Sequence, residues 1–217
     1  MPSSITMEKE KLCSDYDNDF TDYLFYRYCN PLFYYVEQDD INGVKKWIKF
    51  VNDCNDLYET PLFSCVEKDK VNVEILKFLI ENGSDINFKT RDNNLSALAH
   101  YLSFNKNVEP EIVKILIDSG SSVTEEDENG KNLLHMYMCN FNVRINVIKL
   151  LIDSGVNFLQ KDFDNNNILY SYILFHSDKK IFDYLTSLGI DIDETNTSGY
   201  NCKDLIKFRN LTFFDKQ

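Results

Sequence analysis

The sequence predicts an all-α solenoid of similar helix pairs, because two kinds of marker residue recur at nearly constant spacing. One kind is a glycine that ends an apolar run, and the intervals are 37, 35 and 34 residues. These glycines are Gly83, Gly120, Gly155 and Gly189. The other kind is a leucine that begins a second apolar run, at intervals of 36, 36 and 35 residues: Leu62, Leu98, Leu134 and Leu169. Such a period is typical of proteins whose units stack on one another.

The run before each glycine is expected to be a helix. In "NVIKLLI", Val147, Leu150 and Leu151 fall at positions i, i+3 and i+4 and share one helical face. A glycine just after such a run is the usual left-handed C-terminal cap, since it has no Cβ to clash.

A shorter helix is expected at each marker leucine. The sequence there reads "TPLF", "SALA", "NLLH" and "NILY", and the small hydroxyl or amide residue before the run is a natural N-cap. Pro61 fits the first turn, where no backbone donor is needed. The segments between each glycine and the next short helix are rich in Asp and Asn, which favours turns.

Short helix, turn, longer helix, glycine cap and projecting hairpin make up the ankyrin unit, whose signature is matched by "TPLF" at 60–63 and "GKNLLH" at 130–135. We predict an ankyrin-repeat solenoid of about five repeats plus a half, with short projecting hairpins, over residues 20–217. The expected repeats are 24–54, 55–90, 91–126, 127–161, 162–195 and the half-repeat 196–217. Residues 1–19 are expected to be a disordered acidic tail, and 20–29 to cap the first repeat.

Composition argues against several classes of protein. The formal charge of −12 would repel nucleic acid, and no basic run offsets it. No window approaches the ~18 apolar residues of a membrane helix, and the first 20 residues hold no secretion signal. Six cysteines without a C-x-x-C pair are then expected to be reduced thiols of a cytoplasmic protein.

Three groups of residues could suggest metal or catalytic chemistry. Residues 125–130 and 162–167 resemble calcium loops, but the twelfth positions hold Met136 and Ile173 where a glutamate is required. The histidines lie one to a repeat and cannot meet around one zinc ion; they are His100, His135 and His176. His135 occupies the ankyrin signature position, where it is expected to bond backbone. We therefore predict no enzyme activity, no cofactor and no metal site.

Aligning the repeats on their leucines predicts which side chains line the concave groove, where ankyrin arrays usually hold a protein partner. The expected partner-binding residues are Leu57, Tyr58, Glu59, Asn93, Leu95, Phe104, Glu128, Asn129, Lys131, Phe163, Asp164, Phe175 and Tyr200. The three phenylalanines could anchor a partner or could instead pack between repeats. Another set of aromatics is expected in the stacking core: Tyr101, Tyr137 and Tyr172.

Aromatic residues also gather near the end of the chain, where a polar cap is expected: Phe208, Phe213 and Phe214. They could fold back, meet another chain, or be covered by further repeats. The last option, a fragment of a longer array, is favoured. An assembly scaffold that self-associates through this end is the alternative to partner capture.

The tyrosine-rich short helices "LAHYLSFN" and "LLHMYMC", and outer helices such as "VEILKFLIENGSDIN", resemble the ankyrin-repeat proteins of poxviruses, in particular the orthopoxvirus host-range and immune-evasion group. The resemblance spans residues 24–217. It implies capture of a host innate-immune, NF-κB or cell-death signalling protein on the concave face. Relatives deliver the captured protein to a cullin-based ubiquitin ligase through a C-terminal F-box-like segment that this chain lacks, so ligase subunits are expected as partners only if the natural chain is longer.

Overall fold

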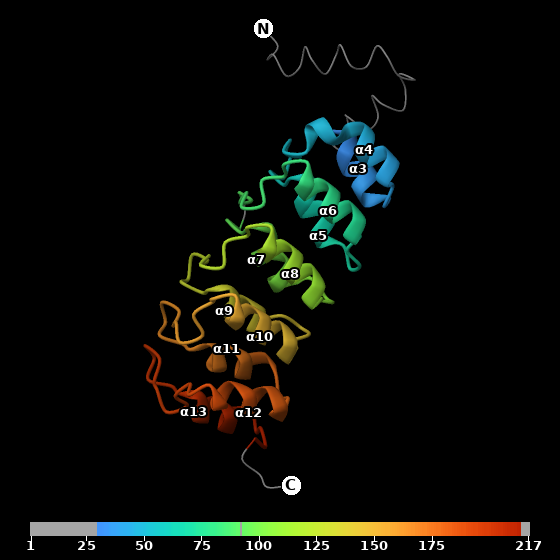
Figure 1. Cartoon of the computed structure of the whole chain (residues 1–217). Helices are drawn as coiled ribbons and strands as arrows, with labels where there is room; N and C mark the ends of the chain where they lie inside the picture. The colour runs from blue at the N-terminus through green and yellow to red at the C-terminus, as the bar shows by residue number, and fades with distance from the viewer. Residues whose placement is uncertain (1–29, 92, 214–217) are drawn as a thin grey trace. The chain divides into compact units, whose positions relative to one another are not determined.

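The computed structural model describes residues 30–91 and 93–213, and its regular structure there is helical (Figure 1). Within those residues the only strand-like pairing is an isolated bridge between Glu126 and Asn132. The all-α repeat prediction is confirmed, while the projecting hairpins are tight turns rather than strand pairs. The chain divides into two compact units, Met1–Asp92 (unit 1) and Asn93–Gln217 (unit 2).

The described residues of unit 1, 30–91, form two helix pairs. Helices α3 (Pro31–Glu37) and α4 (Ile41–Trp47) form the first pair, and α4 continues into the short 3-10 helix η1 (Ile48–Phe50). The second pair is α5 (Pro61–Glu67) and α6 (Val73–Glu81). The first helices of the two pairs pack on each other, as do the second helices. We call them inner and outer helices, respectively.

Unit 2 repeats the same arrangement. Its inner helices are α7 (Ala97–Phe104), α9 (Leu133–Met138), α11 (Ile168–Phe175) and α13 (Cys202–Phe208). Its outer helices are α8 (Pro110–Asp118), α10 (Ile145–Asp153) and α12 (Lys179–Ser187). Each inner helix packs on the next, so α7, α9, α11 and α13 form one row.

The helix ends follow the local signals in the sequence. The Oδ1 atom of Asn132 accepts hydrogen bonds from the backbone amides of Leu134 and His135, which caps α9. Gly120 has a φ of +98°, and the bonds from its amide and from Ser121 back into α8 complete a Schellman motif. The glycine marker is therefore a helix stop, as predicted.

Three tyrosines tie the inner helices α7, α9 and α11 to the outer helix that follows each of them. The rings of Tyr101, Tyr137 and Tyr172 are buried, as predicted. The Tyr101 hydroxyl accepts a bond of 2.9 Å from the amide of Glu109, which is the N-cap of α8. The Tyr137 hydroxyl accepts the same bond from Arg144 before α10. Burial raises the pKa of Tyr137 to about 12, so this hydroxyl stays protonated.

The last described residue of unit 2, Phe213, packs back on the outer helix α12. The Phe213 ring stacks on Phe182 of α12 with centroids 4.3 Å apart, and only 3% of Phe213 is exposed. Of the three explanations considered for the terminal aromatics, folding back therefore holds for Phe213. The predicted tail at 1–19, the predicted cap at 20–29 and Phe214 lie outside the described residues.

Candidate functional site

The predicted hairpin tips of unit 2 are five-residue turns, which we call finger turns, at 127–131, 162–166 and 196–200. In each, the first residue donates its amide to the carbonyl of the fifth, as Asp127 does to Lys131 at 3.0 Å. The Asp127 carboxylate also accepts the amides of Asn129 and Lys131, both at 2.8 Å. Acidic and amide side chains therefore form these turns, consistent with the turn-forming role expected for the two calcium-like segments.

Adjacent finger turns are joined by backbone hydrogen bonds. The amide of Phe163 donates to the carbonyl of Asn129 at 2.9 Å, and the amide of Thr197 donates to Asp164 at the same distance. The Phe163 ring also lies over Gly130, where an added Cβ would meet ring carbons at 2.5 Å. The three finger turns thus form one continuous edge of the surface.

The opposite edge is held by side chains at the ends of the inner helices, which we call helix-end donors. Asn140, just after α9, donates Nδ2 to the carbonyls of Leu102 and Asn105, both at 2.9 Å. One repeat later, Nε2 of His176 lies 3.0 Å from the carbonyl of Met138.

The same arrangement occurs at two further repeats. Arg209 donates to the carbonyls of Ile173 and His176 in unit 2. Lys68 donates to the carbonyl of Glu37 in unit 1, at 3.0 Å. These bonds satisfy carbonyls that the helix ends leave open and fix the spacing of neighbouring inner helices.

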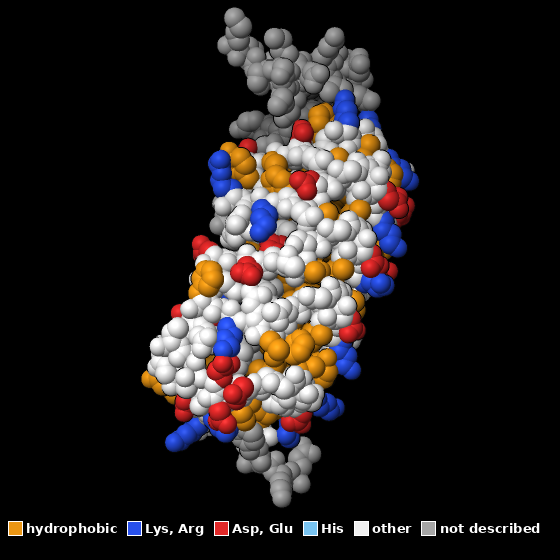
Figure 2. Space-filling model, turned by 60° about the vertical axis from the view of Figure 1, so that its left-hand side comes forward, with side chains coloured by type: hydrophobic (Ala, Val, Ile, Leu, Met, Phe, Trp, Pro, Cys, Tyr) orange, Lys and Arg blue, Asp and Glu red, His pale blue; other side chains and the backbone are white. Residues whose placement is uncertain are grey.

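Between these two edges lies the inner face of unit 2, formed by the finger turns, the inner helices and the loops that follow them. Exposed apolar side chains collect here and are orange in the lower half of Figure 2. The apolar residues at the ends of the inner helices are Phe104, Phe141, Leu174, Phe175 and Phe208. Phe141 and Phe208 are 88% and 83% exposed. Exposure of apolar rings to water is unfavourable, and clusters of such rings are typical of protein-binding surfaces.

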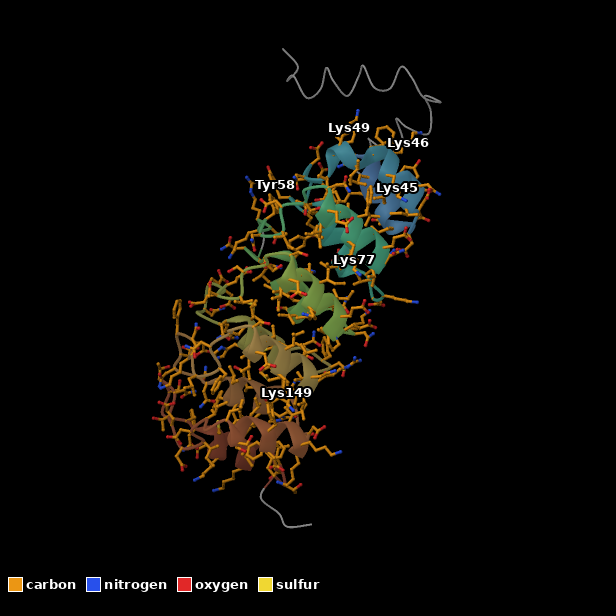
Figure 3. The ribbon with its side chains drawn as sticks, viewed as in Figure 1. Lys45, Lys46, Lys49, Tyr58, Lys77 and Lys149 are labelled. Atoms are coloured by element: carbon orange, nitrogen blue, oxygen red, sulfur yellow. The ribbon has the colours of Figure 1, made fainter. Side chains whose placement is uncertain are left out.

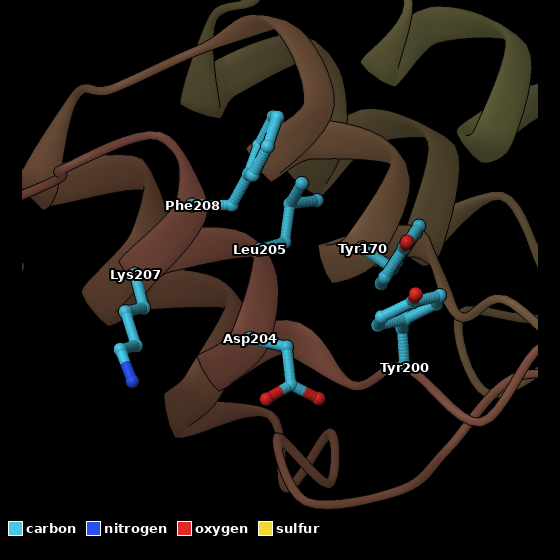
Figure 4. A pocket seen from close by; sticks show the side chains of 6 residues that line it. All are labelled: Tyr170, Tyr200, Asp204, Leu205, Lys207 and Phe208. Carbon is cyan, nitrogen blue, oxygen red and sulfur yellow. The ribbon is translucent and has the colours of Figure 1, made fainter.

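A hollow of about 550 Å³ opens beside α11 and α13 (Figure 4). Its lining residues are Tyr170, Tyr200, Asp204, Leu205, Lys207 and Phe208. The two tyrosines face each other at one side, and Phe208 stands at the other, beyond Leu205. Cavities of this size are typical of ligand-binding sites.

Ten of the thirteen predicted partner-binding residues lie in unit 2. Asn93, Glu128, Asn129 and Asp164 are exposed, and so are the aromatic residues; Lys131 is half-buried. The exposed aromatic residues among them are Phe104, Phe163, Phe175 and Tyr200. Most of this predicted surface is therefore accessible.

The prediction that Leu95 lines the groove is wrong, because only 6% of this residue is exposed. It directly precedes Ser96, the N-cap of α7, which is itself buried. Glu125, which is also buried, accepts hydrogen bonds from both the amide and the hydroxyl of Ser96. Alignment on the marker leucine could not show that this turn is buried.

The other three predicted residues belong to unit 1. Leu57 and Tyr58 are exposed, and the Arg91 guanidinium lies 3.8 Å above the Tyr58 ring centroid. Glu59 is half-buried and accepts a bond from Asn55 within its own turn. Tyr58 therefore already carries a cation on its ring.

The alignment did not select Phe141, Tyr170, Leu205 or Phe208 as partner-binding residues. Phe141 lies in the loop that follows α9, and Tyr170 follows a marker leucine directly. An isolated aromatic in a short loop has no periodic signal, so only the packed structure shows where its ring points. The run of phenylalanines near the end of the chain was the one available hint for Phe208.

Lysines gather on the outer helices of unit 1 (Figure 3). They are Lys45, Lys46, Lys49 and Lys77. The Lys45 ammonium lies 5.8 Å from the centroid of the Phe78 ring, and that of Lys49 lies 5.1 Å from Phe50. The Lys45 and Lys49 ammonium groups therefore cover rings of an otherwise acidic protein.

The histidine at the signature position has a structural role. The ring nitrogens of His135 lie 2.8 Å from Asn132 Oδ1 and 3.1 Å from the Asn166 carbonyl. Burial lowers the pKa of His135, and the Asn166 carbonyl and the Asp162 carboxylate oppose this. His135 thus links its helix to the next finger turn, as predicted.

The buried thiols have no sign of reactivity. Burial raises the pKa of Cys65 and that of Cys202 to about 12, so neither forms a thiolate near neutral pH. In the part of the chain that the structure covers, no three His, Cys, Asp or Glu side chains come close enough to hold a metal ion. Among the same residues, no helix is both long and apolar enough to span a membrane.

Comparisons with known proteins agree with this architecture. A family model described as "Ankyrin repeats (3 copies)" matches residues 32–127 and 99–196. One similar solved structure is a chain in the complex of the predatory endopeptidase Bd0816 from Bdellovibrio bacteriovorus with the immunity protein Bd3460. The TM-score is 0.69 at 19% identity, with 83% of this chain and 92% of that chain covered. At this identity the similarity shows the fold alone.

No curated protein matches the sequence, so these comparisons do not tie the chain to poxviruses. The family assignment depends on the repeats themselves. The two matches together span residues 32–196, which is most of the chain. The chain therefore belongs to the ankyrin-repeat family, whose repeats indicate a protein–protein interaction module.

Proposed function

We propose that this chain is a non-enzymatic module that captures a protein partner on the inner face of unit 2. The observation that carries the proposal is the set of exposed rings at the ends of successive inner helices, above all Phe104, Phe141 and Phe175. Buried aromatic anchors supply much of the binding energy in protein interfaces. A partner that covers these rings would remove them from water along the helix-end edge of the face.

The surroundings of the rings favour a rigid binding surface. Helix-end donors fix the inner helices at one edge, and backbone bonds such as that from Phe163 to Asn129 join the finger turns at the other. A surface that is already ordered loses little conformational freedom when a partner binds. Such a surface suits capture of a folded protein or an extended segment of one.

Within this proposal, the partner is a host innate-immune, NF-κB or cell-death signalling protein, and the chain acts as a viral immune-evasion factor. The support is the resemblance of the tyrosine-rich inner helices, such as "LLHMYMC", to poxvirus ankyrin proteins. The acidic charge and the absence of a spanning helix in the described residues agree with a protein target. The proposal concerns capture alone and includes no delivery to a ubiquitin ligase.

Affinity purification with mass spectrometry tests the proposal. The tagged full chain is expressed in mammalian cells beside Phe104→Ser, Phe141→Ser and Phe175→Ser variants. A partner held on the inner face should be enriched by the parent chain and lost from all three variants. Leu159→Ser is the matched control, since Leu159 and Phe175 are both 58% exposed and Leu159 lies outside the cluster. Equal enrichment by the parent and the three variants would remove the assignment.

A further inference from the structure

The hollow beside α11 and α13 combines aromatic, apolar and acidic chemistry. Tyr170 and Tyr200 lie at one side with Asp204 near them, and Leu205 and Phe208 lie at the other (Figure 4). Of these side chains, Tyr200, Asp204 and Phe208 are exposed, and Tyr170 and Leu205 are half-buried. The hollow therefore offers two adjacent subsites, one with tyrosine rings and a carboxylate, and one that is purely apolar.

The carboxylate of Asp204 retains capacity to bind a cation. Its Oδ2 accepts the amide of Asn201 at 3.1 Å, which completes the capping box of α13. Its Oδ1 accepts no hydrogen bond from any residue in the described part of the chain, and Asp204 forms no ion pair there. The remaining oxygen is available to a donor from outside the chain.

The nearby lysines do not neutralise this carboxylate. Lys203 pairs with Asp193 at 2.6 Å, and Lys161 pairs with Glu194. Lys207 lines the hollow, but its side chain extends away from the two tyrosines (Figure 4). The tyrosine subsite is therefore electronegative.

Within the tyrosine subsite, the Tyr170 side chain is half-buried. Burial raises the pKa of Tyr170, and the neighbouring Tyr200 and Asp204 add to the effect. A cation that enters such a site is attracted by the ring faces as well as by the carboxylate. Arginine fits best, because its flat guanidinium can lie on a ring and still donate to a carboxylate oxygen.

We propose that this hollow is the anchor site for a partner segment in which an arginine is followed by a large aliphatic residue. The guanidinium lies against Tyr170 and Tyr200 and donates to Oδ1 of Asp204. The aliphatic side chain lies on Leu205 and Phe208. This inference rests on the proposed function and adds the sequence chemistry of the captured segment.

The charge of the surface selects this occupant over others. The chain carries a formal charge of −12, and Asp164 and Glu128 are exposed on the adjoining finger turns. An acidic or phosphorylated segment would be repelled, whereas a basic one would be attracted over a distance of about 10 Å at ordinary salt. A second copy of this acidic chain is disfavoured for the same reason.

A peptide titration tests the proposal. The probes are capped decapeptides of Gly and Ser that contain a central Arg-Leu, citrulline-Leu or Arg-Ser pair. Citrulline keeps the shape of arginine without the charge. Binding to the full chain is followed by NMR through the amide signals of Leu205 and Phe208. The Arg-Leu peptide should bind about tenfold more tightly than either matched peptide, the ratio expected for one charge-assisted bond or one aliphatic side chain.

Variants identify the groups responsible. Asp204→Asn keeps the acceptor for the Asn201 amide, and it should abolish the preference for arginine over citrulline while the preference for leucine over serine remains. Phe208→Ser should do the reverse. Asp153→Asn is the control, because Asp153 is an exposed carboxylate on the outer helix α10. Thermal unfolding of each variant establishes that the array is intact.

Equal affinity for the arginine and citrulline peptides would overturn the proposal, as would shifts confined to other repeats. A concentration-dependent dimer that Phe208→Ser dissociates would also overturn it, since a second copy would then fill the hollow. If the peptides do not bind while the inner face still captures its partner, only this inference is overturned. Specific peptide binding without any captured protein would instead contradict the proposed function.

Discussion

The Phe163 ring covers Gly130, which belongs to the finger turn of the preceding repeat. Gly130 is buried with a φ of +73°, and ring carbons of Phe163 occupy the space that a Cβ would need. The same two turns share a backbone hydrogen bond through Asn129. The position of the exposed Phe163 ring therefore requires that residue 130 has no side chain.

Replacement of Gly130 by alanine should lower the free energy of unfolding of the chain by about 1–2 kcal/mol, from the left-handed backbone plus the displaced ring. Urea denaturation followed by circular dichroism measures this loss. Gly199→Ala is the control, because Gly199 has a φ of +81° with nothing within 4 Å of an added Cβ. It should show the backbone cost alone, and equal losses in the two variants would mean that the Phe163 ring yields freely.

Asn140→Asp should destabilise the array by about 2–3 kcal/mol. The change removes both donors to the carbonyls of Leu102 and Asn105 and places a carboxylate beside them in a buried site. Asn142→Asp adds the same charge two residues later at an exposed position and should alter stability by less than about 0.5 kcal/mol. Chemical denaturation compares the two variants, and similar losses in both would contradict the role given to Asn140.

Stability should fall as the pH is lowered from 7.5 to 5.5. Burial lowers the pKa of His135 and of His176 in the folded chain, and for His176 the Arg209 charge adds to this. The folded chain then binds fewer protons than the unfolded one, so acid favours unfolding. The stabilisation is complete above the unfolded histidine pKa of about 6.5 and is lost below it.

Urea midpoints across this pH range measure the effect. His135→Gln should have a lower midpoint at pH 7.5 and a shallower slope, because one of the two groups no longer titrates. A slope identical to that of the parent would show that His135 does not contribute. The range stays above pH 5.5 so that carboxylates contribute little.

Phe175→Ala and Phe163→Ala should each weaken binding of a captured partner by about thirtyfold, the loss typical of an interface anchor. Both side chains are exposed, so their removal should leave thermal unfolding nearly unchanged, although Phe163 packs on Gly130. Surface plasmon resonance with the purified partner measures the affinity. Leu159→Ala should retain it. Unchanged affinity in both phenylalanine variants, with unchanged melting curves, would remove these two residues from the binding site.

The assembly alternative is tested with Phe208→Ser and not with Phe213→Ser. Phe213 stacks on Phe182 in the interior, so its replacement should loosen the last repeat whether or not the chain self-associates. Phe208 is exposed, and Phe208→Ser should leave stability intact. Light scattering should find the parent and this variant monomeric. A parent dimer that the variant lacks would favour assembly over capture.

The elements with periodic signals were predictable from the sequence. Each marker glycine, such as Gly155 with its φ of +98°, ends an outer helix, and the buried tyrosines lie where the repeat alignment placed them. These features depend on local backbone geometry and on burial of one helix face, and both leave a repeating pattern. The helix pairs recur along the chain for the same reason.

Features that depend on hydrogen bonds between different repeats were not predictable. The donor that closes an inner helix is Lys68, Asn140, His176 or Arg209, four residue types without a shared sequence signal. The buried Leu95 directly precedes Ser96, whose hydroxyl donates a hydrogen bond to Glu125, 29 residues later. Such contacts follow from the packed structure and not from spacing along the chain.

The helix-end donors also give the array a direction. Each one sits on the later repeat and reaches back to carbonyls of the earlier one, as Arg209 does to His176. Trimming the chain from its C-terminal side therefore removes the side chains that bond to carbonyls of the repeat left behind, whereas trimming from the N-terminal side removes those carbonyls and leaves the donor side chain. Erosion should accordingly uncover backbone acceptors at one end and side-chain donors at the other.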